Sequence, residues 1–200
     1  SSDLAFWMEG GEGMPRAAAS LASVLSRKPS TAGVTLDTVA LTTADMRALD
    51  TADIAALRTD QIAVMTSSQI AALTTLQVSA FTSGQVMALT TSEISALSTA
   101  DIKALGSSSV SVLNTSQIEV LSSAQIAALS TAEMAALSSE QISVLSTAGV
   151  AAFGTAQVAV LNTTQLAGIG TAQIMALSTV DIRALSTLNV ASLSTDQVAA

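Results

Sequence analysis

The sequence predicts an all-α fold, a tight α-solenoid with one short helix for every eight residues. Two observations predict it. First, the chain repeats itself with a period of eight from Thr42 onward: 19 complete copies fill residues 42–193, and a twentieth, shorter copy ends at Ala200. Second, each copy carries the residue types that begin a helix, in the order in which a helix needs them. A fixed short period is typical of repeat architectures, in which each unit buries its apolar residues against its neighbours.

The positions of the repeat are numbered 1 to 8 from Thr42, and residues 122–129 show the typical pattern. Position 1 is Ser, Thr, Asp, Asn or Gly except at Arg58, and these five types are preferred helix N-caps. Position 2 is always Ser or Thr, and position 4 is Gln, Asp, Glu or Asn except at Ser109 and Gly149. Position 5 is aliphatic, position 7 is mostly Ala with some Val, and position 8 is nearly always Leu, whereas positions 3 and 6 vary.

This pattern predicts a helix start in every copy. If position 1 is the N-cap, position 4 is the third helical residue and can return a hydrogen bond to the N-cap, which makes a capping box. The Leu of the preceding copy and the aliphatic residue at position 5 then stand at the two places of a hydrophobic staple. Leu121, Ser122, Gln125 and Ile126 supply all of these elements in one copy.

A continuous helix is not expected, because eight residues advance about 80° beyond two full turns and would wind the apolar stripe around the helix. We therefore expect a break at the Ser/Thr pair and a helix of about six residues, some 9 Å long, in each copy. Such a helix is stable only when stacked. Positions 5 and 8 then face the axis, and positions 3 and 6 face water. Two or three helices per coil, packed about 9 Å apart, would make a rod of roughly 60–90 Å, and the sequence leaves this number open.

A β-solenoid is the alternative fold, since an even period suits strands and Ile, Val and Thr favour them. Positions 5 and 8, however, differ by three and would point to opposite faces of a strand. The abundance of Ala and Gln also favours helices.

Two regions are expected, an N-terminal capping segment at residues 1–41 and the octapeptide solenoid at residues 42–200. The first contains an aromatic cluster around Trp7, an amphipathic helix over Arg16–Arg27 and a degenerate first repeat over Val34–Leu41. A cap that covers the open end of a solenoid explains it, and a docking site around Trp7 is the alternative. Because the last copy stops one residue short of its Leu, we expect a segment of a longer repeat protein.

The composition argues against catalytic and metal-binding sites. The chain has no His and no Cys, which excludes a Ser-His-Asp triad and thiolate or imidazole metal ligands. The acidic residues at position 4 (Asp45, Asp53, Asp101 and Asp181) are explained by capping boxes and form no calcium loop. We therefore predict no catalytic, cofactor-binding or metal-binding residue, no cofactor and no enzymatic activity.

Charge and hydropathy bound the partners. The net charge is −8, which disfavours nucleic acid, and charged residues are only 11 %, against roughly 25 % in ordinary soluble domains. No apolar run approaches the roughly 18 residues that span a bilayer. No small-molecule substrate is evident, so a protein or a cell-surface component is the expected partner.

The unit Leu-Ser-Thr-Ala-Gln-Ile-Ala-Ala-Leu resembles the first helix of transcription-activator-like effector repeats, but those are much longer and carry a base-reading loop. Residues 42–200 resemble more closely the long bacterial proteins made of tandem Leu-Ser/Thr-Thr-x-Gln-Ile/Val-x-Ala-Leu octapeptides. This resemblance implies a secreted or cell-surface location, with a cytoplasmic one still open.

Three functions are compatible with these observations. The first is a non-catalytic structural rod, a spacer or scaffold segment of a larger secreted or surface protein. The second is a protein-binding scaffold that uses the variable positions 3 and 6. The third is an ice- or carbohydrate-binding surface made of ordered Ser/Thr rows, which requires the position 2 hydroxyls to be exposed rather than bonded to backbone carbonyls.

Overall fold

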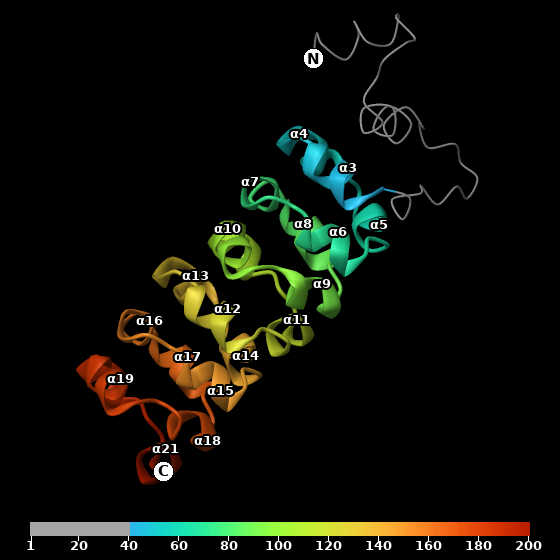
Figure 1. Cartoon of the computed structure of the whole chain (residues 1–200). Coiled ribbons are helices and arrows are strands. Elements are labelled where there is room, and N and C mark those ends of the chain that lie inside the picture. The colour runs from blue at the N-terminus through green and yellow to red at the C-terminus, as the bar shows by residue number, and fades with distance from the viewer. Residues whose placement is uncertain (1–40) are drawn as a thin grey trace, which may run out of the picture.

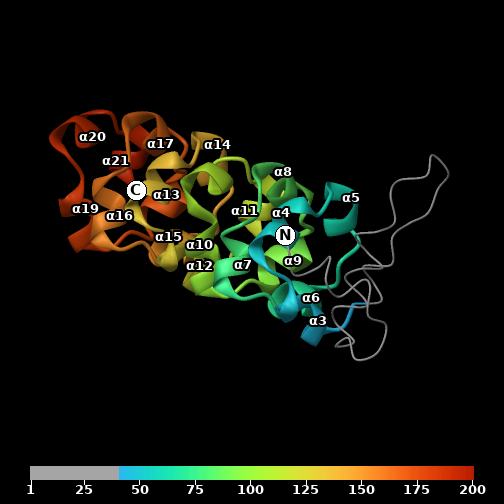
Figure 2. The same ribbon diagram turned by 90° about the horizontal axis from the view of Figure 1, so that it is seen from above.

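A computed structural model of the chain describes residues 41–200, which form an elongated rod of short helices (Figure 1) (Figure 2). This part of the chain contains 19 helices and no strand. The helices are α3 Thr43–Ala48, α4 Thr51–Ala56, α5 Thr59–Ile62, α6 Ser67–Ala71, α7 Thr75–Val78, α8 Ser83–Ala88, α9 Thr91–Ala96, α10 Thr99–Val110, α11 Thr115–Glu119, α12 Ser123–Ala128, α13 Thr131–Ala136, α14 Ser139–Ser143, α15 Thr147–Ala151, α16 Thr155–Ala159, α17 Thr163–Ala167, α18 Thr171–Ile174, α19 Thr179–Ala184, α20 Thr187–Ala191 and α21 Thr195–Ala199. The all-α prediction is confirmed, and the β-solenoid alternative is wrong. The segment predicted to cap the rod lies outside the described residues, apart from the buried Leu41.

Most helices begin with the predicted capping box. In α12 the Oγ of Ser122 accepts the backbone N–H of Gln125 at 3.3 Å, and the Oε1 of Gln125 accepts the backbone N–H of Ser122 at 2.8 Å. Two N–H groups that a helix start would leave without partners are thereby bonded. This matters because a helix of six residues has few internal hydrogen bonds to hold it.

The six-residue helices, such as α8 and α12, end at the Leu of position 8, whereas several shorter helices end one or two residues earlier. Leu129 adopts an extended conformation, with φ −57° and ψ 132°, and its N–H turns back to the carbonyl of Ile126 at 3.2 Å. The next residue, Ser130, is also extended, so two consecutive residues redirect the chain before the next helix begins. The break therefore falls at positions 8 and 1, one residue earlier than the predicted Ser/Thr pair.

Positions 5 and 8 form one continuous core along the rod, as predicted. Ile126 at position 5 has no exposed surface and Leu129 at position 8 is 4 % exposed, and the same two positions are buried in copy after copy from Met46 to Leu177. Full burial of such a side chain contributes about 1.5–3 kcal/mol. The core, rather than helix propensity, therefore holds these short helices.

The Gln side chains of position 4 connect one coil of the solenoid to the next. Gln125 is 3 % exposed, and its Nε2 donates to the carbonyls of Ile94 at 3.0 Å and Leu97 at 2.9 Å. Those carbonyls stand at positions 5 and 8 of the copy four repeats earlier. Nine glutamines make this pair of bonds: Gln77, Gln85, Gln117, Gln125, Gln141, Gln157, Gln165, Gln173 and Gln197. We call each such contact a Gln joint.

Helices three repeats apart also pack side by side, for example α6 with α9, α12 with α15 and α16 with α19. In Figure 1 the helices α4, α7, α10, α13, α16 and α19 therefore follow one another along one edge of the rod. Because the helices that pack side by side are three repeats apart, one coil holds about three repeats. This number lies within the expected two or three helices per coil.

The small residue at position 7 permits close approach of neighbouring coils, and Gly168 shows how close they come. A Cβ atom at Gly168 would lie 2.4 Å from the carbonyl oxygen of Ser139, which belongs to the helix three repeats earlier. Contacts this short to a backbone atom are not tolerated without movement. Glycine is therefore needed at Gly168, whereas most copies have room for alanine at position 7.

The copy at residues 106–113 departs from the pattern. It has Gly106 in place of a capping side chain and Ser109 in place of Gln, so it lacks both halves of the capping box. Gly106 adopts φ 75°, a left-handed conformation that favours glycine, and it interrupts α10 between two repeats. This copy can form neither a side-chain capping box nor a Gln joint.

Candidate interaction surface

The outer surface of the rod includes positions 3 and 6, as the sequence predicts. Both positions are exposed in every copy from Ala44 to Ala199. They lie on the solvent side of each helix because positions 4, 5 and 8 turn inward. A partner that binds along the rod can therefore contact these two positions together with positions 1 and 2, which are exposed in most copies.

The position 2 hydroxyls lie mostly on the surface. Their side chains are exposed in 13 copies and half-buried in seven. Among the position 2 residues within residues 42–200, only Ser123 bonds across coils, and its Oγ donates to the carbonyl of Ala148 at 3.1 Å. A row of exposed Ser and Thr is therefore the common arrangement.

The acidic residues of position 4 act as helix caps, as predicted. Asp45, Asp53, Asp101 and Asp181 each complete a capping box with the residue three places earlier. In α4 both partners of the capping box are acidic, since the N-cap is Asp50. Burial is the main cause that raises the pKa of Asp53, and the negative charge of Asp50 raises it further. The hydrogen bond from the backbone N–H of Asp50 acts in the opposite direction but does not cancel this rise. The caps draw these carboxylates into separate helices and leave no shared site.

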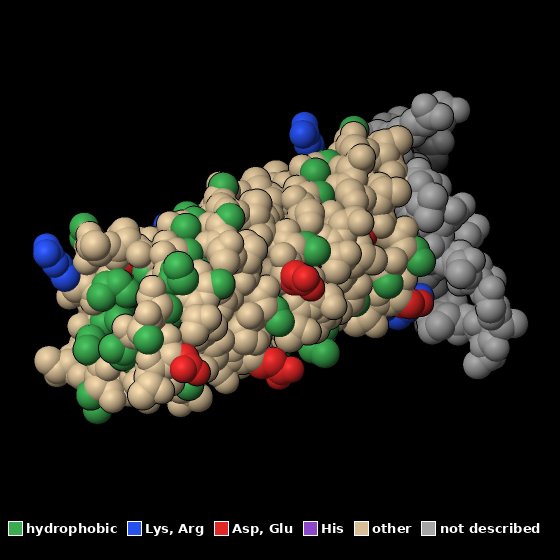
Figure 3. Space-filling view, turned by 90° about the horizontal axis from the view of Figure 1, so that it is seen from below, with side chains coloured by type: hydrophobic (Ala, Val, Ile, Leu, Met, Phe, Trp, Pro, Cys, Tyr) green, Lys and Arg blue, Asp and Glu red, His purple; other side chains and the backbone are tan. Residues whose placement is uncertain are grey.

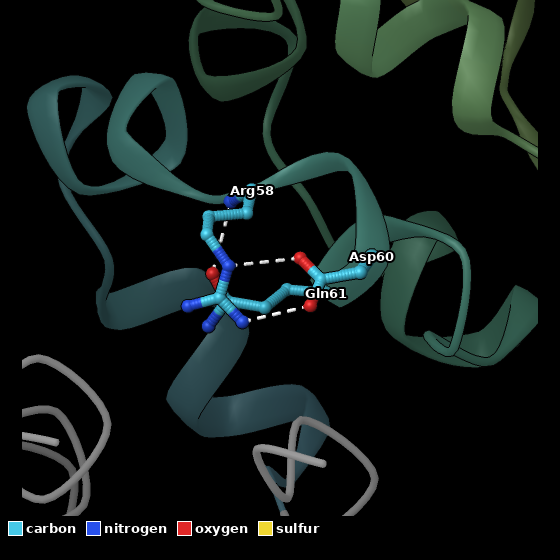
Figure 4. A network of polar contacts seen from close by, with 3 residues as sticks. All are labelled: Arg58, Asp60 and Gln61. Atoms are coloured by element: carbon cyan, nitrogen blue, oxygen red, sulfur yellow. Dashed lines mark hydrogen bonds and ion pairs between the residues drawn. The ribbon is translucent and has the colours of Figure 1, made fainter. Parts of the chain in front are cut away.

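Arg58 stands at position 1 although its side chain has no acceptor with which to cap a helix. Its guanidinium turns outward to Asp60, with Nε–Oδ1 and Nη2–Oδ2 distances of 2.9 and 2.8 Å, while its backbone N–H still donates to Oε1 of Gln61 (Figure 4). The bond to the guanidinium lowers the pKa of Asp60, and the same bond raises the pKa of Arg58. The pair is exposed, so water and salt weaken it and it contributes little to stability.

The other basic residues within residues 41–200 do not form a patch. Arg47 donates its Nε to the carbonyl of Ala72 at 3.2 Å and so serves a contact between coils. Lys103 and Arg183 lie ten repeats apart in sequence, both at position 6. Figure 3 shows isolated acidic and basic side chains on a surface that is mostly neither charged nor apolar. No group of three or more potential metal-ligating side chains occurs within residues 41–200.

Exposed apolar side chains are scattered along the rod and gather near one end. Leu76, Met87 and Met175 stand exposed at positions 3 and 6. Near the end of the described chain, Leu188, Val190 and Val198 are exposed as well, and Figure 3 shows a cluster of apolar side chains at one end of the rod. Val190 and Val198 occupy position 5, which is buried under later copies elsewhere in the rod.

The Gln joint was not predicted from the sequence. Position 4 is Gln in 11 of 20 copies and Glu in two, although Glu completes a capping box equally well. The preference for an amide indicates that a hydrogen-bond donor is needed as well as an acceptor. That preference is the signal that could have identified the joint.

The described residues thus form an all-α repeat solenoid, which is the architecture of a structural repeat protein. No helix among them is long and apolar enough to cross a membrane. A family model described as the ALTTAQ repeat matches residues 38–75, 94–131, 126–155, 134–171, 147–179 and 174–200. These matches cover more than half of the sequence, so the chain belongs to the ALTTAQ repeat family. No curated protein and no solved structure matches the chain.

Proposed function

We propose that the chain is a non-catalytic rod that acts as a spacer or scaffold segment of a larger secreted or cell-surface bacterial protein. The observation that carries this proposal is the uniformity of the rod: positions 3 and 6 are exposed in every copy, yet few of them carry charge. Positions 1, 4, 5 and 8 serve caps, joints and core, and position 2, which is always Ser or Thr, is mostly an exposed hydroxyl. A molecule built in this way sets a distance rather than binds one ligand.

The test distinguishes the effect of the number of repeats from the effect of the residues at the surface. It is carried out in the bacterium that makes the protein, with an epitope added after Ala200. One variant shuffles the residues of positions 3 and 6 among the copies and keeps the number of copies. A second deletes residues 122–145, which are three whole octapeptides. A spacer keeps the height of the epitope above the cell surface in the first variant and loses height in the second.

The opposite pattern would refute the spacer. If shuffling abolishes function while the deletion is tolerated, positions 3 and 6 bind a partner and the protein is a binding scaffold. An epitope that stays protected from protease on intact cells and becomes accessible only after lysis would refute the surface location.

The exposure of the position 2 hydroxyls favours a second candidate, a surface that binds ice or carbohydrate. Replacing exposed threonines such as Thr131, Thr147, Thr155 and Thr171 with valine keeps the side-chain shape and removes the hydroxyl. Under this second proposal the variant loses inhibition of ice recrystallisation or retention on polysaccharide, while its circular dichroism spectrum is unchanged. Equal behaviour of both proteins in these assays removes this candidate.

A further inference from the structure

Two copies place an acid where the others place the amide of the Gln joint. Glu93 and Glu133 occupy position 4, and each is 1 % exposed. The Oε2 of Glu93 accepts the N–H of Thr90 at 2.6 Å, and the Oε2 of Glu133 accepts the N–H of Ser130 at 2.6 Å. One oxygen of each carboxyl group therefore takes the place of the Gln Oε1 in the capping box.

The other oxygen takes the place of the Gln Nε2 and has no partner. The Oε1 atoms of Glu93 and Glu133 are buried and make no hydrogen bond. In the Gln copies this place faces two backbone carbonyls, those found 31 and 28 residues earlier. The equivalent carbonyls are those of Ile62 and Met65 for Glu93, and of Ile102 and Leu105 for Glu133.

An ionised carboxylate does not fit this place. A carboxylate oxygen can only accept hydrogen bonds, and so can a carbonyl oxygen, so three acceptors would face one another without a donor. Burying a charged group without a hydrogen-bonding or ionic partner is strongly unfavourable. A neutral carboxyl group, in contrast, has one O–H that can donate to a carbonyl as the amide N–H does.

No charged neighbour supplies the missing donor. The elements around Glu93 and Glu133 are α5, α6, α8, α10, α11, α12, α14 and α16. Their charged side chains are Arg58, Asp60, Asp101, Lys103, Glu119 and Glu140. All but Asp101 are exposed, Arg58 is bonded to Asp60, and Asp101 is bonded to Ser98.

We propose that Glu93 and Glu133 are neutral carboxyl groups in the folded rod, each with its Oε1–H donating to a backbone carbonyl of the preceding coil, and that they form two proton-dependent joints. Loss of the proton to water removes the only donor and leaves an unpaired charge between two coils. The joint is then weakened at that point of the rod, while the Gln joints on either side are unaffected. Stability from these two carboxyl groups is therefore present at low pH and lost as the pH rises.

A proton fits this place better than a metal ion. The Gln joints have donor–acceptor distances of 2.6–3.3 Å, which suit a hydrogen bond. Ca²⁺ requires six or more oxygen ligands, and only three oxygen atoms would meet here.

The test compares Glu93→Gln, Glu133→Gln and the double variant with the parent over a range of pH. Glutamine supplies an N–H donor at every pH without having to bind a proton from solution. Each single variant should therefore raise the ratio of folded to unfolded protein about tenfold at neutral pH. The gain should shrink as the pH falls, because the parent then holds its own proton. Glu140→Gln, at an exposed position 3, is the matched control and should show no such pH-dependent gain.

An infrared difference spectrum between the parent and the double variant gives a direct reading. We expect the carbonyl stretch of a neutral carboxyl group to be present in the parent and absent in the variant. Parallel pH profiles for parent and variant, or a carboxylate band in place of the neutral band, would overturn the proposal. So would a pH dependence that addition of Ca²⁺ or Na⁺ removes, since a cation would then fill the joint.

Discussion

Replacing Gln125 with alanine should weaken the rod more than any surface change, because Gln125 serves two structures at once. Its Oε1 closes the capping box on the N–H of Ser122, and its Nε2 holds the carbonyls of Ile94 and Leu97 in the preceding coil. Alanine removes these three hydrogen bonds, together with the one that the Oγ of Ser122 donates to Oε1 at 3.0 Å, and leaves the backbone partners buried or half-buried.

The magnitude comes from those three bonds. A hydrogen bond contributes about 1 kcal/mol net, and removing one partner while the other stays buried costs about 1–3 kcal/mol. The three lengths are 2.8, 3.0 and 2.9 Å, so all three bonds are well formed. We expect the free energy of unfolding to fall by about 3–5 kcal/mol, allowing for some entry of water.

Denaturant titration followed by circular dichroism measures the total effect, and native-state hydrogen exchange locates it. Protection should fall first in the copies at residues 90–97 and 122–129. The control is Ala124→Gln, which places the same side chain at an exposed position 3 and should change stability by less than about 0.5 kcal/mol. A loss below about 1 kcal/mol for Gln125→Ala would refute the view that the Gln joints hold the coils together.

Individual contacts give two further predictions. Gly168→Ala should destabilise the rod by about 1–3 kcal/mol, because its Cβ would meet the carbonyl of Ser139, whereas Gly84→Ala meets only a methyl group at 3.8 Å and should be neutral or slightly stabilising in thermal unfolding. Asp50→Ser should lower the pKa of Asp53, measured by NMR titration of its carboxyl carbon, because it removes the neighbouring negative charge. Because burial raises the pKa of Asp53, this carboxyl group stabilises the folded state at low pH, and that stabilisation is lost as the pH rises through the folded-state pKa. The Asp50→Ser variant should lose less stability over this pH range. A pKa of Asp53 that stays unchanged in the variant would show that burial alone sets it.

Local structure could be predicted from the sequence because its determinants lie within one copy. A cap such as Ser122, its partner Gln125 and the staple residue Ile126 are at most four residues apart, so the period displays their relationship directly. The burial of positions 5 and 8 was predictable from the same spacing.

The relationship between coils could not be predicted in the same way. The bond from Gln125 to Ile94 joins residues 31 apart, and an eight-residue period is equally compatible with bonds to any earlier copy. The number of repeats per coil depends on how the helices of neighbouring coils pack, which the period does not specify. The surface role of position 2 was left open for the same reason, since exposure is decided by the neighbouring coils.

Because each octapeptide packs on the helix three repeats back and each Gln joint reaches the copy four repeats back, the rod has the symmetry of a screw. Every octapeptide occupies an equivalent place in a lattice whose neighbours are three and four steps away, much as residues do in an α-helix. Insertion or loss of one octapeptide by recombination then lengthens or shortens the rod by one step and leaves every remaining Gln with a carbonyl pair four steps back. A solenoid whose coils are closed units must gain or lose a whole coil at once. This chain can change its length in increments of eight residues, so the reach of the protein can be adjusted finely by mutation without redesign of its interior.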